Sequence, residues 1–154
     1  MGPSGHLLRT LAAVPPGARV VCLGDRGAAH AEPLARLGFD VWAALPAPAA
    51  VRARLADVLG AAEADRRVTS ARPGALGYPD FWADWIVLAP PTPSALEEAA
   101  RVLRPGGWVW VEAETADGLV EAAARAGLLV AEPPGADPER GTVHAVFRRP
   151  GGVG

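Results

Sequence analysis

Two glycines and two charged residues, placed after an apolar run, form the first group in the sequence that could bind a ligand. The run is residues 19–23, RVVCL, and Gly24, Asp25, Arg26 and Gly27 follow it. Glycine lets the backbone approach a ligand closely at a strand-to-helix turn, and a helix N-terminus attracts anions. The same glycines also suit a tight turn that binds nothing, so both interpretations stay open.

Two arginines could form an anion site. Arg26 and Arg72 are both expected at the carboxyl edge of the predicted sheet, where a phosphate, a nucleotide or a carboxylate could meet two guanidinium groups. The more common outcome for such residues is an ion pair, here with Asp25 or Asp80.

The other titratable side chains form no catalytic constellation. His30 could act as a general base near neutral pH, but a solvated surface histidine is the more common case. Glu112 and Glu114 follow a predicted strand and could orient an amine or hydroxyl group, or remain solvated. His6 and His144 lie far apart in the chain, and with one cysteine no spacing indicates a metal site. The catalytic residues therefore stay unknown, and no metal is expected.

The composition predicts one globular domain over residues 1–154. Half of the residues are hydrophobic and 21% are charged, and the formal net charge is -2, so no charge excess indicates nucleic-acid binding. Cys22 is the only cysteine, which favours a cytoplasmic location. The apolar stretch 7–14 is too short and interrupted for a signal peptide or a membrane span.

Apolar runs and turn residues predict alternating strands and helices. The strands are expected at residues 19–23, 39–44, 67–70, 82–88, 108–112, 128–132 and 142–148, with a loop at 133–141. The helices are expected at 7–14, 28–37, 51–59, 93–103 and 116–126, the fourth being capped by Thr92 or Ser94 and ended by Pro105, Gly106 and Gly107. This alternation implies a mainly parallel sheet covered on both faces, and the last two strands imply an antiparallel hairpin. The predicted fold is a three-layer α/β/α Rossmann-like domain with seven strands, a core at about 7–149 and loose ends at 1–5 and 150–154.

Three segments of the chain match motifs of one known family. Residues 101–108, RVLRPGGW, match a segment commonly written R-V-L-[KR]-P-G-G, which precedes that family's fifth strand. Residues 33–41, PLARLGFDV, match its first helix running into its second strand, and residues 78–88 match its F-P-D loop and F-D-x-V strand. Together with the order of seven strands, these motifs resemble the class I S-adenosylmethionine methyltransferases over residues 19–149. The resemblance implies a Rossmann-like fold and S-adenosylmethionine as the cofactor.

The resemblance places the methionine end of the cofactor beside residues 24–27. The family's turn reads D-x-G-x-G-x-G, and of its glycines only Gly24 is present here. Cys22 stands in place of the acid, and Arg26 and Ala28 stand in place of the later glycines. An arginine side chain at that position would intrude on the space of the cofactor.

Two further cofactor positions follow from the same resemblance. Leu45 holds the place of an acidic residue that accepts hydrogen bonds from the ribose hydroxyls, and Arg72 the place of one that contacts the adenine amino group. Neither side chain has an acceptor, and each lost hydrogen bond weakens binding by roughly 0.5–3 kcal/mol.

These observations lead to two main hypotheses. The first is a methyltransferase-like protein with a degenerate cofactor site and weak or absent methyl transfer. The alternative is an active small-molecule methyltransferase that holds S-adenosylmethionine mainly by backbone around residues 24–28. A nicotinamide-dependent oxidoreductase is a third class, but the G-x-G-x-x-G pattern is missing after the first strand. The short segment at residues 89–91 predicts a shallow or open cleft, and the expected partners are a small-molecule ligand and a second copy of the chain.

Overall fold

A seven-stranded sheet forms the centre of the molecule, with the spatial order β3-β2-β1-β4-β5-β7-β6. The computed structural model describes residues 3–72 and 74–151. The strands are β1 (Arg19–Leu23), β2 (Asp40–Leu45), β3 (Val68–Ser70), β4 (Ala83–Leu88), β5 (Leu103–Ala113), β6 (Leu129–Asp137) and β7 (Thr142–Arg148). The helices are α1 (Gly5–Leu11), α2 (Gly24–Ala28), α3 (Ala31–Arg36), α4 (Ala49–Leu59), α5 (Ala61–Arg67), α6 (Pro93–Val102) and α7 (Leu119–Arg125).

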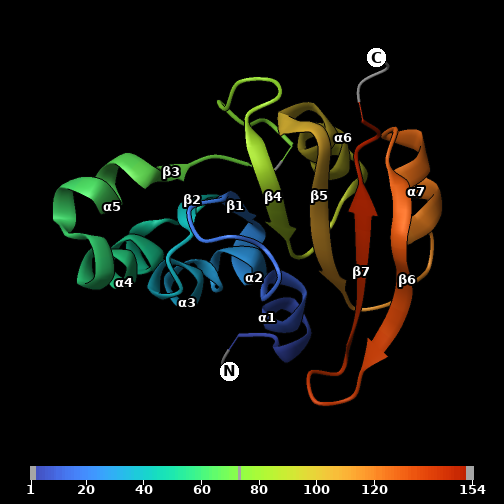
Figure 1. Ribbon diagram of the computed structural model, residues 1–154, viewed down its shortest axis with the longest axis horizontal. Coiled ribbons are helices and arrows are strands. Elements are labelled where there is room, and N and C mark those ends of the chain that lie inside the picture. Colours follow the sequence, from blue (N-terminus) through green and yellow to red (C-terminus); the bar gives the residue numbers. More distant parts are fainter. Residues whose placement is uncertain (1–2, 73, 152–154) are drawn as a thin grey trace.

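Five neighbouring strands run parallel, and the last two turn back. β3, β2, β1, β4 and β5 pair in parallel, whereas β7 pairs antiparallel with both β5 and β6. In Figure 1 helices α2 to α5 gather around the β3–β2–β1 half of the sheet, α1 lies below β4 and next to β5, and α6 and α7 lie beside and behind the β5–β7–β6 half. The predicted fold class is therefore confirmed.

Side chains of each central strand alternate between two apolar layers. Val20 and Cys22 of β1 pack into the layer formed with α1 to α5, and Val21 and Leu23 pack into the layer formed with α6 and α7. A strand that is buried on both faces needs apolar residues at every position, which explains the unbroken apolar run in the sequence.

Several predicted boundaries were wrong, and glycines lie at the three described here. The helix expected at 28–37 is the pair α2 and α3, of which α2 already begins at Gly24. Gly106 and Gly107 were expected to end a helix, but they lie inside β5, where the backbone forms a bulge opposite β4 and hydrogen bonds to Arg149 on the other side. The helix α5 was not predicted, because Gly60 was read as a stop although a second helix begins directly after it.

The ends of the chain also differ from expectation. Ser4 and Gly5, predicted to be loose, are ordered: Ser4 is buried and its hydroxyl accepts the Leu7 N–H at the start of α1. Positions 1–2 and 152–154 of the predicted loose ends lie outside the described residues. The loop expected at 133–141 is shorter, because β6 continues to Asp137 beyond two prolines that an edge strand tolerates.

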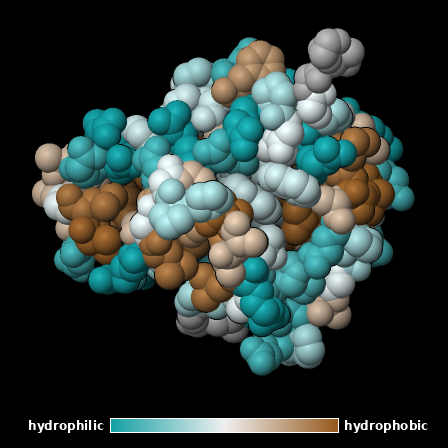
Figure 2. Space-filling model, in the orientation of Figure 1, coloured by the Kyte–Doolittle hydropathy of each residue, from teal (hydrophilic) through white to brown (hydrophobic). Residues whose placement is uncertain are grey.

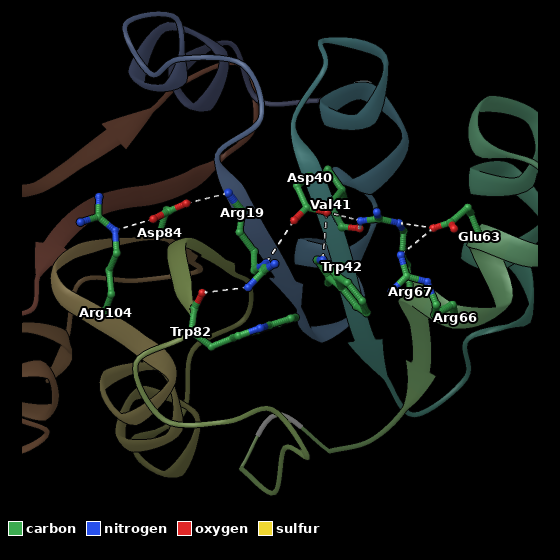
Figure 3. A network of polar contacts seen from close by, with 10 residues as sticks. All are labelled: Arg19, Asp40, Val41, Trp42, Glu63, Arg66, Arg67, Trp82, Asp84 and Arg104. Carbon is green, nitrogen blue, oxygen red and sulfur yellow. Dashed lines mark hydrogen bonds and ion pairs between the residues drawn. The ribbon is translucent and has the colours of Figure 1, made fainter.

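Charged residues at the starts of the five parallel strands alternate in sign across the sheet. In spatial order they are Arg67 before β3, Asp40 of β2, Arg19 of β1, Asp84 of β4 and Arg104 of β5, shown in Figure 3. The Arg19 side chain contacts Asp40 at 3.1 Å, and its backbone N–H donates to Asp84 at 2.8 Å. Arg67 also pairs with Asp40, and Arg104 with Asp84. This ion-pair row, named here for these five residues, closes the amino edge of the sheet.

Apolar surface is present outside the core. Figure 2 shows brown surface at the α4–α5 end and again on the α7 side of the face in view. Leu129 and Val130 of the edge strand β6 are about half exposed. None of the described helices combines the length and apolar character needed to cross a membrane. The expected homodimer stays a prediction.

Candidate functional site

The turn after β1 is packed against the backbone that follows β4. Gly24 has a φ of +78°, and a Cβ built there would lie 2.4 Å from the carbonyl oxygen of Ala89. A Cβ on Gly27 would lie 2.8 Å from the carbonyl oxygen of Val87. The N–H groups of Arg26 and Gly27 both donate to the Ala89 carbonyl, at 3.1 and 3.0 Å. Both glycines thus allow the backbone of the turn to pack closely against the backbone of residues 87–89.

The other predicted cofactor residues differ in burial and in partners. Asp25 is exposed, and Arg26 reaches Glu114 with an Nη2 to Oε1 distance of 3.6 Å. Leu45 is 4% exposed and lies in the apolar layer beneath α1 to α5. Arg72 is exposed. Position 45 therefore offers a buried, apolar side chain.

The expected partners of the two arginines were wrong. Arg26 pairs with Glu114, because the β5–α7 connection lies closer to its guanidinium than Asp25 of its own helix. Asp80 pairs with Arg101 of α6, at 2.7 Å. Neither of the two cavities described next is lined by Arg72.

A cavity of about 480 Å³ lies between the β4–α6 and β5–α7 connections. One wall carries Pro90, Pro91 and Leu96, and the other carries Glu114 and Asp117. This cavity opens at the carboxyl edge of the parallel strands, where α/β folds commonly bind ligands. An apolar body with a cationic or hydroxyl group would suit these walls.

A second, polar cavity of about 250 Å³ lies on the opposite side of β5. It is lined by Pro3, Arg26, Ala29, His30, Glu112, Arg140 and Thr142. Glu112 is 1% exposed and accepts two hydrogen bonds from Arg140, at 2.5 and 3.0 Å, and one from the Thr142 hydroxyl at 3.0 Å. Burial acts to raise the pKa of Glu112, but the hydrogen bonds from Arg140 and Thr142 outweigh it and lower the pKa. The possibility that Glu112 is a solvated carboxylate was therefore wrong.

His30 is buried, which corrects the expectation that it lies on the surface. It is 1% exposed because the turn between α2 and α3 places it beneath the N-terminal segment. Its Nδ1 lies 3.0 Å from the carbonyl oxygen of Arg26, and its Nε2 accepts the Ser4 N–H at 3.2 Å. Burial lowers the pKa of His30. A neutral imidazole with its proton on Nδ1 satisfies both contacts.

His6 and His144 meet on the same side of the sheet, although 138 positions separate them in the printed sequence. Their rings stack with centroids 3.5 Å apart, and Nε2 of His6 lies 2.7 Å from Glu132. The indole N–H of Trp110 donates to Nδ1 of His6 at 2.9 Å. Three groups that could bind a metal converge here. However, a metal bound through Nε2 of His6 would need the proton on Nδ1, at which the Trp110 N–H already points.

The sequence did not predict that the residues of the polar cavity would meet, because they come from elements that are distant in the chain. Arg140 lies in the β6–β7 turn, Glu112 on β5 and His30 after α2, and no local spacing relates them. One signal was available: Glu112 and Thr142 lie where two predicted strands end and begin. An antiparallel pairing of those strands would have placed them at one edge.

Solved structures share this architecture at low sequence identity. A SAM-dependent methyltransferase from Methanosarcina mazei has a TM-score of 0.70 at 11% identity, over 99% of this chain and 100% of that one. The chain has the class I methyltransferase fold. The N-methyltransferase NodS from Bradyrhizobium japonicum, in complex with S-adenosyl-L-homocysteine, has a TM-score of 0.65 at 17% identity, over 94% of this chain and 84% of that one. No protein-family profile matches the sequence.

The class I methyltransferase fold also occurs in a protein that is named for a different reaction. The [4+2]-cyclase SpnF has a TM-score of 0.66 at 16% identity, over 96% of this chain and 81% of that one. Because one fold carries different reactions, the function of this class I methyltransferase-like chain depends on the groups at its carboxyl edge.

Proposed function

We propose that this methyltransferase-like protein has a degenerate S-adenosylmethionine site and transfers methyl groups weakly or not at all. The single observation that carries the proposal is the turn at residues 24–27 after β1, called the sealed turn here because the backbone carbonyl of Ala89 packs directly against it. The Ala89 carbonyl accepts the N–H groups of Arg26 and Gly27, so two donors at the start of α2 already have a partner. Gly24 packs against the same carbonyl so closely that a Cβ would not fit between them.

The chemistry of two other positions supports the proposal. Leu45 is buried and has no polar atom, and Arg72 can donate but cannot accept. A ribose needs acceptors for its hydroxyls, and an adenine amino group needs one as well. The side chains at these two positions therefore do not fit S-adenosylmethionine.

Calorimetric titration of the purified protein with S-adenosylmethionine and S-adenosylhomocysteine tests the proposal without knowledge of an acceptor. We expect no saturable heat up to about 1 mM ligand, which corresponds to a binding free energy weaker than about -4 kcal/mol. Saturable binding with a dissociation constant near 1 μM, about -8 kcal/mol, would overturn the proposal.

A double variant tests the same residues by restoring the missing features. Arg26→Gly combined with Leu45→Asp should gain measurable affinity, since a carboxylate accepts from both ribose hydroxyls. The matched control, Arg26→Gly with Leu45→Asn, has nearly the same size and no charge, and should gain less. Circular dichroism establishes that both are folded. Equal affinity in the two folded variants would contradict the assignment of position 45 to the ribose.

The 480 Å³ cavity favours a second candidate, an active small-molecule methyltransferase. The cavity adjoins the turn through Pro90 and carries Glu114 and Asp117, which could hold an amine or hydroxyl acceptor. This candidate requires that the cofactor be held mainly by backbone. It becomes the better explanation if the titration shows micromolar binding.

A further inference from the structure

We propose that the N-terminal segment, residues 3–11, is held in place by two histidines that must stay neutral, and that their protonation releases the segment and opens the polar cavity beneath it. The segment comprises Pro3, Ser4 and α1. One histidine, His30, receives a donor from the segment, and the other, His6, belongs to the segment and receives a donor from the sheet.

His30 holds the segment through its unprotonated Nε2. The Ser4 N–H donates to this atom at 3.2 Å, and Ser4 is 1% exposed. The other ring nitrogen faces the Arg26 carbonyl, which can only accept. A second proton on His30 would therefore bind at Nε2 and point at the Ser4 N–H. The contact would become a repulsion between two donors in a buried place.

His6 holds the segment through its unprotonated Nδ1. The donor is the indole N–H of Trp110, at 2.9 Å, and an indole can never accept. Trp110 is fully buried in the sheet. The proton of neutral His6 is then on Nε2, which donates to Glu132 at 2.7 Å. Protonation at Nδ1 would again bring two N–H groups together.

The charged groups around His6 act in both directions. Glu132 of β6 attracts an imidazolium, whereas His144 of β7, stacked at 3.5 Å, and Arg9 of α1 oppose a positive charge. Burial is the largest effect and, with His144, lowers the pKa of His6. The docked segment therefore disfavours a proton on His6.

The surroundings of His30 give the same result. Glu112 of β5 favours a charge on His30, but its carboxylate is held by two hydrogen bonds from Arg140, which itself opposes that charge. The indole ring of Trp110 packs edge-on against the imidazole at 5.6 Å. His30 therefore binds a proton less readily with the segment docked than with it released.

The sign of the pH dependence follows from this difference. A released histidine has a pKa of about 6.5, so below that pH the released form binds more protons than the docked form. Each histidine then weakens docking by as much as about tenfold per pH unit, and the two together by as much as about a hundredfold. Because Pro3 lines the polar cavity together with Arg26 and His30, release removes one of its walls.

Hydrogen–deuterium exchange of the full chain tests the proposal. Protection factors, corrected for the chemical exchange rate at each pH, would be compared at pH 7.5 and pH 5.5 for peptides covering residues 4–11. We expect protection of this segment to fall at least about tenfold at pH 5.5, while a peptide covering β1 keeps its protection. Unchanged protection of residues 4–11 would overturn the proposal, and so would an equal loss in β1, which means global unfolding.

Variants separate the two histidines from other acid effects. His30→Gln places an amide oxygen near the position of Nε2, and His6→Asn places one near Nδ1, so both keep an acceptor that does not titrate. The double variant should lose most of the pH dependence. The control His144→Asn removes the third imidazole but neither acceptor, and should keep it. Equal pH dependence in the double variant and the wild type would overturn the proposal.

A measurement on the wild type keeps the test independent of how the variants fold. Nitrogen-15 NMR of the imidazoles at pH 7.5 reports which ring nitrogen carries the proton. We expect the proton on Nε2 of His6 and on Nδ1 of His30. The opposite tautomer at either residue would remove the acceptor on which the proposal depends.

Discussion

The two edges of the same sheet use ionisable residues in opposite ways. At the amino edge, the ion-pair row favours the charged form of Asp40: burial acts to raise the pKa of Asp40, but hydrogen bonds from Arg67 and Arg19 outweigh it and lower the pKa. At the carboxyl edge and the layer above it, His6 and His30 are held neutral, because burial lowers the pKa of both. The two edges should therefore respond to acid in different pH ranges.

The ranges follow from the direction of each shift. A lowered histidine pKa gives stability that is complete above about pH 6.5 and is lost as the pH falls below it. A lowered aspartate pKa gives stability that persists until the pH falls below about 4. Mild acid should loosen the carboxyl edge first, while the ion-pair row still holds the amino ends of the strands.

The largest expected effect comes from the pair of buried Glu112 and partly buried Arg140 at the carboxyl edge. Arg140→Met leaves the Glu112 carboxylate buried without its charged partner, with only the Thr142 hydroxyl still donating to it, and should lower the free energy of unfolding by about 3–5 kcal/mol. Denaturation in urea at pH 7 measures this. The double variant Glu112→Gln with Arg140→Met should recover most of the loss, because no buried charge is left.

The matched variant at the other edge sharpens the comparison. Arg104 lies in the ion-pair row with a side chain that is 53% exposed, so Arg104→Met should cost no more than about 1 kcal/mol. Similar losses of unfolding free energy for Arg140→Met and Arg104→Met would contradict the comparison, because removing an arginine would then cost the same at both edges.

The second effect concerns the sealed turn. Gly24→Ala should destabilise the protein by about 2–3 kcal/mol, since it combines a left-handed conformation with a Cβ too close to the Ala89 carbonyl. Gly60→Ala is the control: it has a φ of +89° with nothing within 4 Å, so only the conformational cost remains. Thermal unfolding would compare them, and equal losses would mean that the turn can accommodate a Cβ beside the Ala89 carbonyl.

The third effect concerns Asp40, at the centre of the ion-pair interactions of the amino edge. Asp40→Asn removes the charge that receives Arg19 and Arg67 but keeps a side chain of the same shape, and should cost about 1–2 kcal/mol at pH 7. Because the asparagine does not titrate, the loss relative to wild type should shrink below pH 4. A loss that is constant from pH 7 to pH 3 would contradict a lowered pKa for Asp40.

Local patterns in the sequence were sufficient for most of the fold. The apolar runs predicted all seven strands, and Thr92 caps α6 as expected, accepting the Ala95 N–H at 3.1 Å. Boundaries failed where glycine or proline serves a tertiary purpose. Gly106 and Gly107 remain within β5 because Arg149, the residue after β7, exchanges backbone hydrogen bonds with them, and a single sequence does not show that partner.

The candidate site was predicted less completely than the fold. The sequence located Gly24 and Gly27 at the turn after β1, but not that both face the backbone of residues 87–89. It identified His30 and Glu112 as candidates and gave surface positions as the more common case. Their burial depends on α1 and on the β6–β7 turn, which reach them from opposite ends of the chain.

The sequence by itself determined the order of strands and helices, the apolar layers and the residues missing from the cofactor motif, because each of these depends on neighbours within a few positions. Only the tertiary structure decided which charges meet. The starts of five strands alternate in sign only in the spatial order β3-β2-β1-β4-β5, and His6 meets Trp110 and His144 only because β5 and β7 pair. Electrostatic and hydrogen-bonding partners are fixed by distances in space, and in a sheet with crossover connections those distances bear little relation to separation along the chain.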